Sequence, residues 1–221
     1  VDEEQRRNLL ADVTHEQRTP LTVMQGNLEA LLDGVYPRDD EHLAPILEET
    51  RVLSRLVDDL RILSLAESGA LKLHREPTDL GALIEETLSS FRAQSDSAGV
   101  ELIANIPDDV PSLELDPVRI REVLANLIAN ALRYTPSGGK VEAAVSVSGN
   151  KIAVSIRDTG TGIPPEDLPH IFDRFYRSEQ SRGMGLGLAI AKYLVAAHNG
   201  EIVAESEPGK GTAFRFLLPL S

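Results

Sequence analysis

The chain has 221 residues, of which 42% are hydrophobic and 26% charged, the composition of an ordinary globular protein with one large domain or two small ones. It contains no cysteine, which excludes disulfides and thiolate metal sites. The net charge of −13, from 22 basic and 35 acidic residues, argues against a nucleic-acid binder, which would need a basic face. Any bound phosphate would therefore have to be held by local donors.

Residues 1–67 are predicted to form a helical hairpin. Apolar residues recur at alternating spacings of three and four in two stretches, one ending near Asp33-Gly34 and the other running from Leu43 to Leu63. Two helices of about thirty residues would each be roughly 45 Å long, and a lone hairpin of that length cannot bury both seams well. We therefore expect a homodimer with a four-helix bundle. The alternative is that the hairpin packs on the rest of its own chain.

The opposite face of the first helix is polar and carries His15, which is expected to point to solvent. Thr19 lies one turn further on, on the same face. Pro20 removes the amide that would bond to the Glu16 carbonyl, so the helix should kink beside His15. A neutral imidazole nitrogen is a competent nucleophile, and a neighbouring carboxylate can orient it or take its proton. The same residues are also consistent with a plain polar face and a proline bend.

Residues 68–70 (Ser-Gly-Ala) are predicted to be a hinge, with a second domain over residues 71–221. In that domain strands are predicted at 71–74, 100–106, 112–115, 141–147, 151–158, 201–205 and 212–218. Helices are predicted from a cap at Thr78 or Asp79 to about Ser97, from Asp116-Pro117 to about Tyr134, and over 186–198. This mixture lacks βαβ regularity, so we expect an α/β sandwich with one mixed or mostly antiparallel sheet and helices on one side. The fold class is therefore α + α/β.

The helix that follows Pro117 is expected to have two distinct faces. The buried stripe is Ile120, Leu124, Leu127 and Ala131, and the polar face is Glu122, Asn126, Asn130 and Arg133. Asparagine is a poor helix former, and two of them at a spacing of four suggest a task. Amide oxygens beside a cation suit Mg²⁺ held jointly with phosphates. A solvated polar face is the alternative.

Two glycine-rich segments are candidate ligand loops. Asp158–Ile163 directly follows a predicted strand, and its glycines permit a tight turn and close ligand approach. Asp158 could accept a hydrogen bond from the amino group of a base, although an Asx-capped turn explains the segment almost as well. Gly183–Leu188 opens a predicted helix, and such an N-terminus can hold an anion.

Together these motifs resemble the transmitter region of bacterial sensor histidine kinases over essentially the whole chain. The segments that carry the resemblance, in the family's order, are the phosphoacceptor box His15–Leu21, the N box Asn126–Thr135, the glycine box Asp158–Ile163, the F box Phe172–Arg177, the second glycine box Gly183–Leu188 and the last box Gly209–Thr212. The resemblance implies that His15 is phosphorylated and that Glu16 assists proton transfer from it. The spacing of Glu16 and Thr19 also resembles the family's phosphatase motif, in which Thr19 would position water against a phosphorylated response regulator.

The resemblance also implies an ATP–Mg²⁺ site in residues 71–221. Asn130 would ligate Mg²⁺ with Asn126 beside it, and Asp158 would accept a hydrogen bond from the adenine amino group. Tyr134 and Ile163 would line the base pocket, and Arg133 would approach the phosphates. The other residues expected to bind the nucleotide are those of the glycine boxes, namely Gly160, Gly162, Gly183, Gly185, Leu186, Gly187 and Thr212, with Gly185 and Gly187 under an ATP lid.

The sequence departs from the family pattern in two places. Gln17 stands where the family usually has an apolar residue, and the periodicity places it in the seam, where it would fix register or oligomeric state at some cost in stability. The stretch 177–183 is short for an ATP lid. The remaining histidines, His42, His74, His170 and His198, match no phosphoacceptor pattern and are expected to be surface or structural.

The expected activity is that of a homodimeric protein-histidine autokinase that passes its phosphoryl group to an Asp of a response regulator and also acts as its phosphatase. The alternatives are a related ATPase module, of the kind in chaperones and gyrases, and a non-enzymatic or phosphatase-biased regulator. The sequence has no membrane span or signal peptide and begins at Val1. We expect a soluble, cytoplasmic piece of a longer protein, and the resemblance implies that this parent is a membrane-anchored sensor, as many of the family are.

Overall fold

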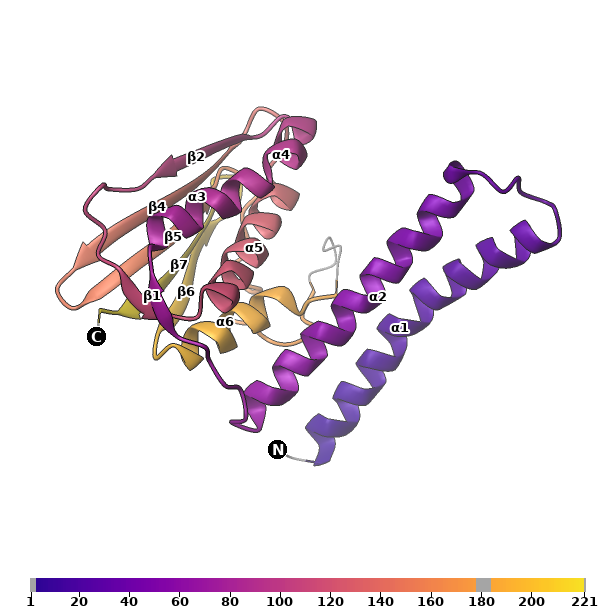
Figure 1. The fold of residues 1–221 in the computed structure, drawn as a ribbon, viewed down its shortest axis with the longest axis horizontal. Helices are drawn as coiled ribbons and strands as arrows, with labels where there is room; N and C mark the ends of the chain where they lie inside the picture. The colour runs from indigo at the N-terminus through magenta and orange to yellow at the C-terminus, as the bar shows by residue number, and fades with distance from the viewer. Residues whose placement is uncertain (1–2, 178–183, 221) are drawn as a thin grey trace. The chain divides into compact units, whose positions relative to one another are not determined.

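The computed structural model describes residues 3–177 and 184–220. The chain divides into two compact units, Val1–Ile62 and Leu63–Ser221, so the division falls within the second helix (Figure 1). The predicted succession of a helical hairpin and an α/β sandwich is confirmed. None of the helices in the described ranges combines the length and the apolarity needed to cross a lipid bilayer.

The first unit is a hairpin of α1 (Glu3–Leu32) and α2 (Asp40–Glu67). The α1 helix ends as predicted, with Gly34 in the left-handed conformation (φ +72°) and the Val35 amide donating to the Ala30 carbonyl at 2.9 Å. Pro20 lies inside α1, which is helical on both sides of it. Between the helices, the Thr50 hydroxyl lies 3.3 Å from the Met24 sulfur and donates to the Ile46 carbonyl within α2 at 2.8 Å.

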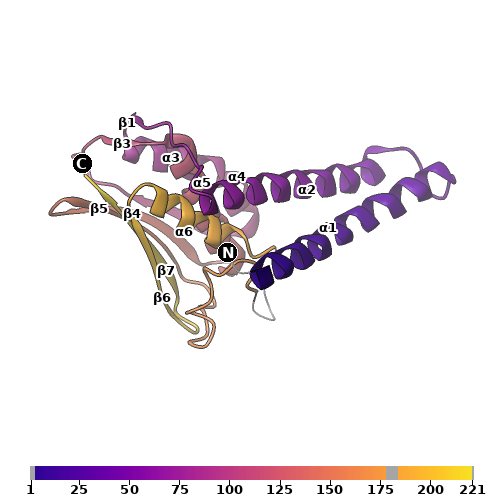
Figure 2. The ribbon, with the colours of Figure 1, turned by 90° about the horizontal axis from the view of Figure 1, so that it is seen from below.

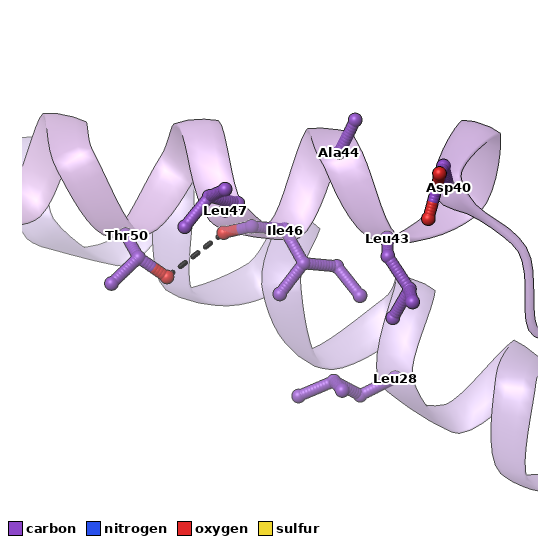
Figure 3. Close-up of a pocket in the computed structure, with 7 residues that line it drawn as sticks. All are labelled: Leu28, Asp40, Leu43, Ala44, Ile46, Leu47 and Thr50. Atoms are coloured by element: carbon purple, nitrogen blue, oxygen red, sulfur yellow. Dashed lines mark hydrogen bonds between the residues drawn. The ribbon is translucent and has the colours of Figure 1, made fainter.

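Much of the predicted apolar seam is exposed in the single hairpin. The exposed fractions are 50% for Leu21, 46% for Leu28, 46% for Leu43, 53% for Leu47 and 56% for Val57. Near the connecting loop, the two helices enclose an open groove of about 480 Å³. The groove is lined by Leu28, Asp40, Leu43, Ala44, Ile46, Leu47 and Thr50 (Figure 3). One hairpin therefore does not bury its own apolar face, as its length predicts.

The second unit is built on a mixed sheet in the order β2-β4-β5-β7-β6. Its strands are β2 (Glu101–Asn105), β4 (Lys140–Ser148), β5 (Lys151–Asp158), β6 (Glu201–Glu207) and β7 (Gly211–Pro219). β2 and β4 run parallel, whereas β4–β5, β5–β7 and β6–β7 are antiparallel pairs. The helices α3 (Leu80–Ser90), α5 (Pro117–Tyr134) and α6 (Gly187–Ala197) lie over one face of the sheet (Figures 1 and 2). This confirms the predicted sandwich.

The α5 helix matches its predicted boundaries because its start is capped by side-chain chemistry. Asp116 accepts hydrogen bonds from the amides of Val118 and Arg119, both at 3.1 Å, and Pro117 occupies the first turn. The predicted stripe of Ile120, Leu124, Leu127 and Ala131 is buried against the sheet layer. Complete burial of one Leu or Ile side chain contributes about 1.5–3 kcal/mol, so this stripe fixes which face of α5 remains for polar residues.

Two predicted elements are wrong. Residues 71–74 do not form a strand; the amide of His74 donates to a carboxylate oxygen of Asp116 at 2.9 Å instead of to a ladder partner. The strand in this region is β1 (Glu76–Thr78), which pairs antiparallel with β3 (Leu113–Leu115). The predicted helix to Ser97 has Asp79 as its cap but breaks at Phe91, so that α3 is followed by a separate α4 (Arg92–Ala98).

His198 links the end of α6 to the start of α5. It is 3% exposed, its Nδ1 donates to the Leu194 carbonyl at 2.8 Å, and its Nε2 accepts the Asp116 amide at 3.1 Å. This arrangement requires the neutral imidazole, since a protonated Nε2 could not accept a hydrogen bond. Burial lowers the pKa of His198, and the nearby Arg75 lowers it further, against the opposing effects of the Leu194 carbonyl and Asp116. The prediction that this histidine is structural fits its position.

We expect the second unit to lose stability as the pH falls below about 6.5, because the unfolded chain then binds a proton that buried His198 resists. The slope from this one group is at most about 1.4 kcal/mol per pH unit. His198→Gln should flatten the dependence of the melting temperature on pH between about pH 5 and pH 7.5. His170→Gln, at an exposed histidine, is the matched control. Equal pH profiles for wild type and His198→Gln would contradict this role.

Candidate functional site

Asp158 is a buried carboxylate at the end of β5. It is 4% exposed, and its Oδ1 accepts the amides of Gly160 at 2.8 Å and Thr212 at 3.2 Å. Burial raises the pKa of this carboxyl, and the two amide hydrogen bonds oppose that rise. Since both amides donate to Oδ1, Oδ2 is the oxygen available to a ligand within the described residues. A buried acceptor in this position suits a ligand that brings its own N–H donor.

The loop that follows Asp158 is tied to two neighbouring elements. The Thr161 amide donates to the Tyr134 carbonyl at the end of α5 at 3.1 Å, and the Gly209 amide donates to the Thr161 carbonyl at 2.7 Å. Gly162 has a φ of +70°, and a Cβ at this position would collide with the backbone of Glu207. Glycine is therefore needed at this position, as predicted, because the loop passes close to the β6–β7 turn.

The polar face of α5 connects this loop to the start of α6. Asn126, Asn130 and Tyr134 recur every four residues and are all half-buried. At a rise of 1.5 Å per residue, Asn126 and Tyr134 are about 12 Å apart along the helix. A Cβ on Gly187 would lie 3.3 Å from Oδ1 of Asn126, so the start of α6 sits directly beside this asparagine. The N box thus meets one glycine segment at each end.

The polar face predicted for this helix also includes Glu122 and Arg133. Glu122 is half-buried and forms an ion pair with Arg119 at 3.0 Å. Arg133 is exposed on α5, one residue before Tyr134. The predicted phosphate contact of Arg133 stays a prediction.

The F box is held against the second glycine box. Phe175 has a φ of +57°, and its amide donates to the Gly185 carbonyl at 3.0 Å. The Phe172 ring packs edge-on against Phe214 of β7, with centroids 6.3 Å apart. Leu186 follows Gly185 and is 1% exposed, so it anchors the start of α6 in the core. The backbone before α6 is therefore fixed from two directions.

Tyr176 adds a polar contact to this arrangement. Its hydroxyl donates to Oδ1 of Asp167 at 2.6 Å. That hydrogen bond, with burial and the nearby acidic charges, raises the pKa of Tyr176 to about 12, so the phenol is neutral at physiological pH. The phenol therefore acts as a hydrogen-bond donor that braces the segment leading to Arg177.

Most of the residues predicted for the nucleotide site fall into two groups. The first group is connected by hydrogen bonds of the glycine loop and β7, and it consists of Tyr134, Asp158, Gly160, Gly162 and Thr212. The second group lies at the start of α6 and consists of Asn126, Gly185, Leu186 and Gly187. Ile163 is half-buried, and its amide donates to the hydroxyl of Ser206 at 2.8 Å. Ser206 is not among the residues predicted from the sequence, although the alternation Ile202, Ala204, Ser206 places a hydroxyl on the inward face of β6.

Other predicted residues are described only in part. His15 and Glu16 belong to the helical backbone of α1, and predictions about their side chains lie outside what the structure describes. Thr19 is exposed on α1, and Gln17 is half-buried. Gly183 and the proposed short lid lie outside the described residues.

Two family models match the chain. The one described as "Histidine kinase-, DNA gyrase B-, and HSP90-like ATPase" covers residues 115–221, and the one described as "His Kinase A (phospho-acceptor) domain" covers residues 5–69. The first match supports ATP as the nucleotide of the second unit.

Among curated relatives, signal transduction histidine-protein kinase BaeS of Escherichia coli is 38% identical over 99% of this chain and 48% of its own length. Sensor histidine kinase WalK of Bacillus subtilis is 40% identical over 98% of this chain and 37% of its own length. The chain therefore spans half or less of these relatives.

Solved structures of histidine kinases match nearly the whole chain, and two of them serve as examples. Acinetobacter baumannii histidine kinase AdeS is 33% identical with a TM-score of 0.81, over 94% of this chain and 98% of that one. Histidine kinase ThkA in complex with response regulator protein TrrA is 25% identical with a TM-score of 0.75, over 99% of this chain and 64% of that one.

We expect Asp158→Asn to separate ligand binding from folding. The Asn side-chain oxygen can still accept the amides of Gly160 and Thr212, but an NH₂ group replaces Oδ2 and opposes a ligand amino group. Affinity for ATP should fall about 10- to 100-fold, the range for losing one hydrogen bond to a charged group. The melting temperature at pH 7 should not fall, because the variant removes a buried charge.

ATP titration and thermal unfolding measure the two effects. Asp109→Asn, at an exposed carboxylate, is the matched control and should change neither. Unchanged ATP affinity in Asp158→Asn would show that Oδ2 does not contact the nucleotide.

Proposed function

The chain belongs to the histidine kinase family, and we propose that it is an ATP-dependent protein-histidine kinase that phosphorylates its own His15. The observation that carries this proposal is the polar face of α5, which meets a glycine segment at each end and has the buried acceptor Asp158 beside it. A plain ATPase would have no use for a phospho-acceptor domain over residues 5–69 of the same chain.

The nucleotide lies along α5 in this proposal. Oδ2 of Asp158 accepts a hydrogen bond from the adenine amino group, and Tyr134 and Ile163 line the base pocket. The triphosphate extends towards the start of α6, where the free amides of an eleven-residue helix favour anions. Arg133 approaches the phosphates. Because the protein carries a net charge of −13, these local donors must offset an unfavourable overall field.

Asn130 is the proposed Mg²⁺ ligand, with Asn126 beside it. In the described ranges there is no group of three or more His, Cys, Asp or Glu residues able to hold a metal ion, so a cation would need phosphate oxygens as additional ligands. This fits Mg²⁺, which is usually bound by few protein groups together with substrate phosphates. When bound, Mg²⁺ neutralises charge that develops on the β- and γ-phosphate oxygens.

Phosphoryl transfer begins with the imidazole of His15 as the nucleophile. A nitrogen–phosphorus bond forms to the γ-phosphorus as the bond to the bridging oxygen of the β-phosphate breaks, and ADP leaves. Glu16 accepts the proton that the attacking imidazole loses. Positioning and charge neutralisation supply most of the rate enhancement in such reactions, so the second unit acts mainly by holding ATP in line with His15.

The phosphoryl group then passes from His15 to an aspartate of a response regulator. This chain resembles histidine kinase ThkA over 99% of its length, and ThkA has been solved in complex with response regulator protein TrrA. That complex supports a response regulator as the partner. Thr19 is exposed one turn after His15, and we assign it to a separate phosphatase reaction, in which its hydroxyl positions water against the phosphorylated aspartate, inorganic phosphate leaves and the free aspartate is restored. The membrane anchor expected upstream of Val1 remains a prediction.

A second copy of the chain is the proposed cover for the exposed seam of the hairpin. Leu43 and Leu47 are each about half exposed and lie at the mouth of the groove between α1 and α2 (Figure 3). Pairing two hairpins would bury these side chains in a four-helix bundle. Gln17, half-buried in the single chain, would lie within that bundle and help to fix its register.

Incubation with γ-labelled ATP tests the proposal. Wild type should acquire acid-labile, base-stable label, and His15→Ala should acquire none because the nucleophile is absent. His42→Ala is the matched control, since this histidine lies in the same hairpin and bonds to Asp39 at 2.7 Å. It should label as wild type does.

Two outcomes would contradict the proposal. Undiminished label in His15→Ala would place the phosphoryl group elsewhere. Phosphate released by wild type without any labelled protein would favour the ATPase alternative.

A further inference from the structure

Ser206 lies opposite Thr212 where β6 and β7 pair, and its hydroxyl has three partners. It accepts the Ile163 amide at 2.8 Å, lies 3.0 Å from the Gly211 carbonyl, and lies 2.9 Å from the Thr212 hydroxyl. Ser206 is half-buried on the inward face of β6. It therefore joins the glycine loop after Asp158 to the strand that also donates to Asp158.

The proton count of a hydroxyl decides how these contacts are made. A serine hydroxyl has one hydrogen to donate and two lone pairs to accept. The Gly211 carbonyl can only accept, so it takes the single Ser206 proton, and the Ile163 amide takes one lone pair. The other lone pair accepts the hydrogen of Thr212. This is the arrangement that satisfies all three partners at once.

Thr212 is consequently left with lone pairs alone for any further partner. It is 6% exposed, and its own amide donates to Oδ1 of Asp158 at 3.2 Å, so Thr212 and Asp158 are neighbours where β7 pairs with β5. The groups that these two residues offer a ligand are the Thr212 hydroxyl and Oδ2 of Asp158. Both groups then present acceptors. An amino group carries two hydrogens and satisfies both, whereas a carbonyl oxygen at the same position would face two acceptors and no donor.

We propose that Ser206 is a specificity-determining residue of the ATP site, which holds the Thr212 hydroxyl as an acceptor and so favours a purine with a 6-amino group over one with a 6-oxo group. The inference rests on the proposed ATP-binding function. Ser206 acts through Thr212 and the loop at Ile163 and is a positioning residue. Without it, the Thr212 hydroxyl is free to rotate and to donate its hydrogen to a carbonyl oxygen.

Titration of the 221-residue chain with Mg²⁺–ATP and Mg²⁺–ITP tests this role, because inosine carries an oxygen where adenosine carries the amino group. Wild type should prefer ATP by about 100-fold or more, as expected for a site that hydrogen-bonds the discriminating group. Ser206→Ala should narrow this preference about tenfold, which corresponds to one hydrogen bond. Ser206→Thr retains the hydroxyl and should restore the preference, and Ser146→Ala on the exposed part of β4 should leave it unchanged.

The preference ratio distinguishes specificity from simple loosening of the pocket. If Ser206→Ala weakens ATP and ITP equally, the ratio is unchanged and the proposal is wrong. If the alanine variant unfolds, Ser206→Cys fills the same volume with a weak hydrogen-bonding group and should give the same narrowing. A wild type that binds neither nucleotide would instead overturn the proposed function.

Discussion

The carboxylate of Asp158 is the interaction on which the candidate site depends. One of its oxygens holds two backbone amides, from Gly160 in the loop after β5 and from Thr212 in β7, and so fixes two segments that are far apart in the sequence. Removing this group from water is costly unless the charge is hydrogen-bonded, and the two amides supply that compensation. A ligand donor at the second oxygen would complete it, so binding and local order are coupled.

The α5 helix provides the scaffold on which this interaction becomes a site. Its buried stripe is set by apolar contacts with the sheet layer, and this leaves Asn126, Asn130 and Tyr134 on a different face by helical periodicity alone. Glycine at position 187 lets the start of α6 approach Asn126, and the carbonyl of Tyr134 holds the glycine loop. In the proposed function, base recognition and phosphate binding would therefore lie about two turns apart on one helix.

Local signals predicted most of the fold. The Asp116-Pro117 pair marks the start of α5, and the two strands predicted at 141–147 and 151–158 form the β4–β5 hairpin, because caps and strand patterns are properties of neighbouring residues. Long-range partners were not predictable in this way. The stretch 71–74 reads as a strand, but its hydrogen bond goes to the side chain of Asp116, 42 residues away from His74.

The candidate site shows the same contrast between local signals, which were predictable, and long-range contacts, which were not. Asp158 and the glycine boxes were found because their residue types carry their chemistry in the sequence. Ser206 was not found, since one inward serine on a strand is unremarkable until the pairing with Thr212 and the contact with Ile163 are known. The roles proposed for His15 and Glu16 rest on the family pattern and on the phospho-acceptor match over residues 5–69.

Titration of the Asp158 carboxyl by ¹³C NMR, with and without Mg²⁺–ATP, tests the central claim most directly. We expect a pKa above the usual range for aspartate in the free protein, because burial outweighs the two amide hydrogen bonds. We also expect a lower pKa in the complex, where the adenine amino group would donate to the charged form. An ordinary pKa in the free protein that ATP leaves unchanged would contradict both the burial and the contact.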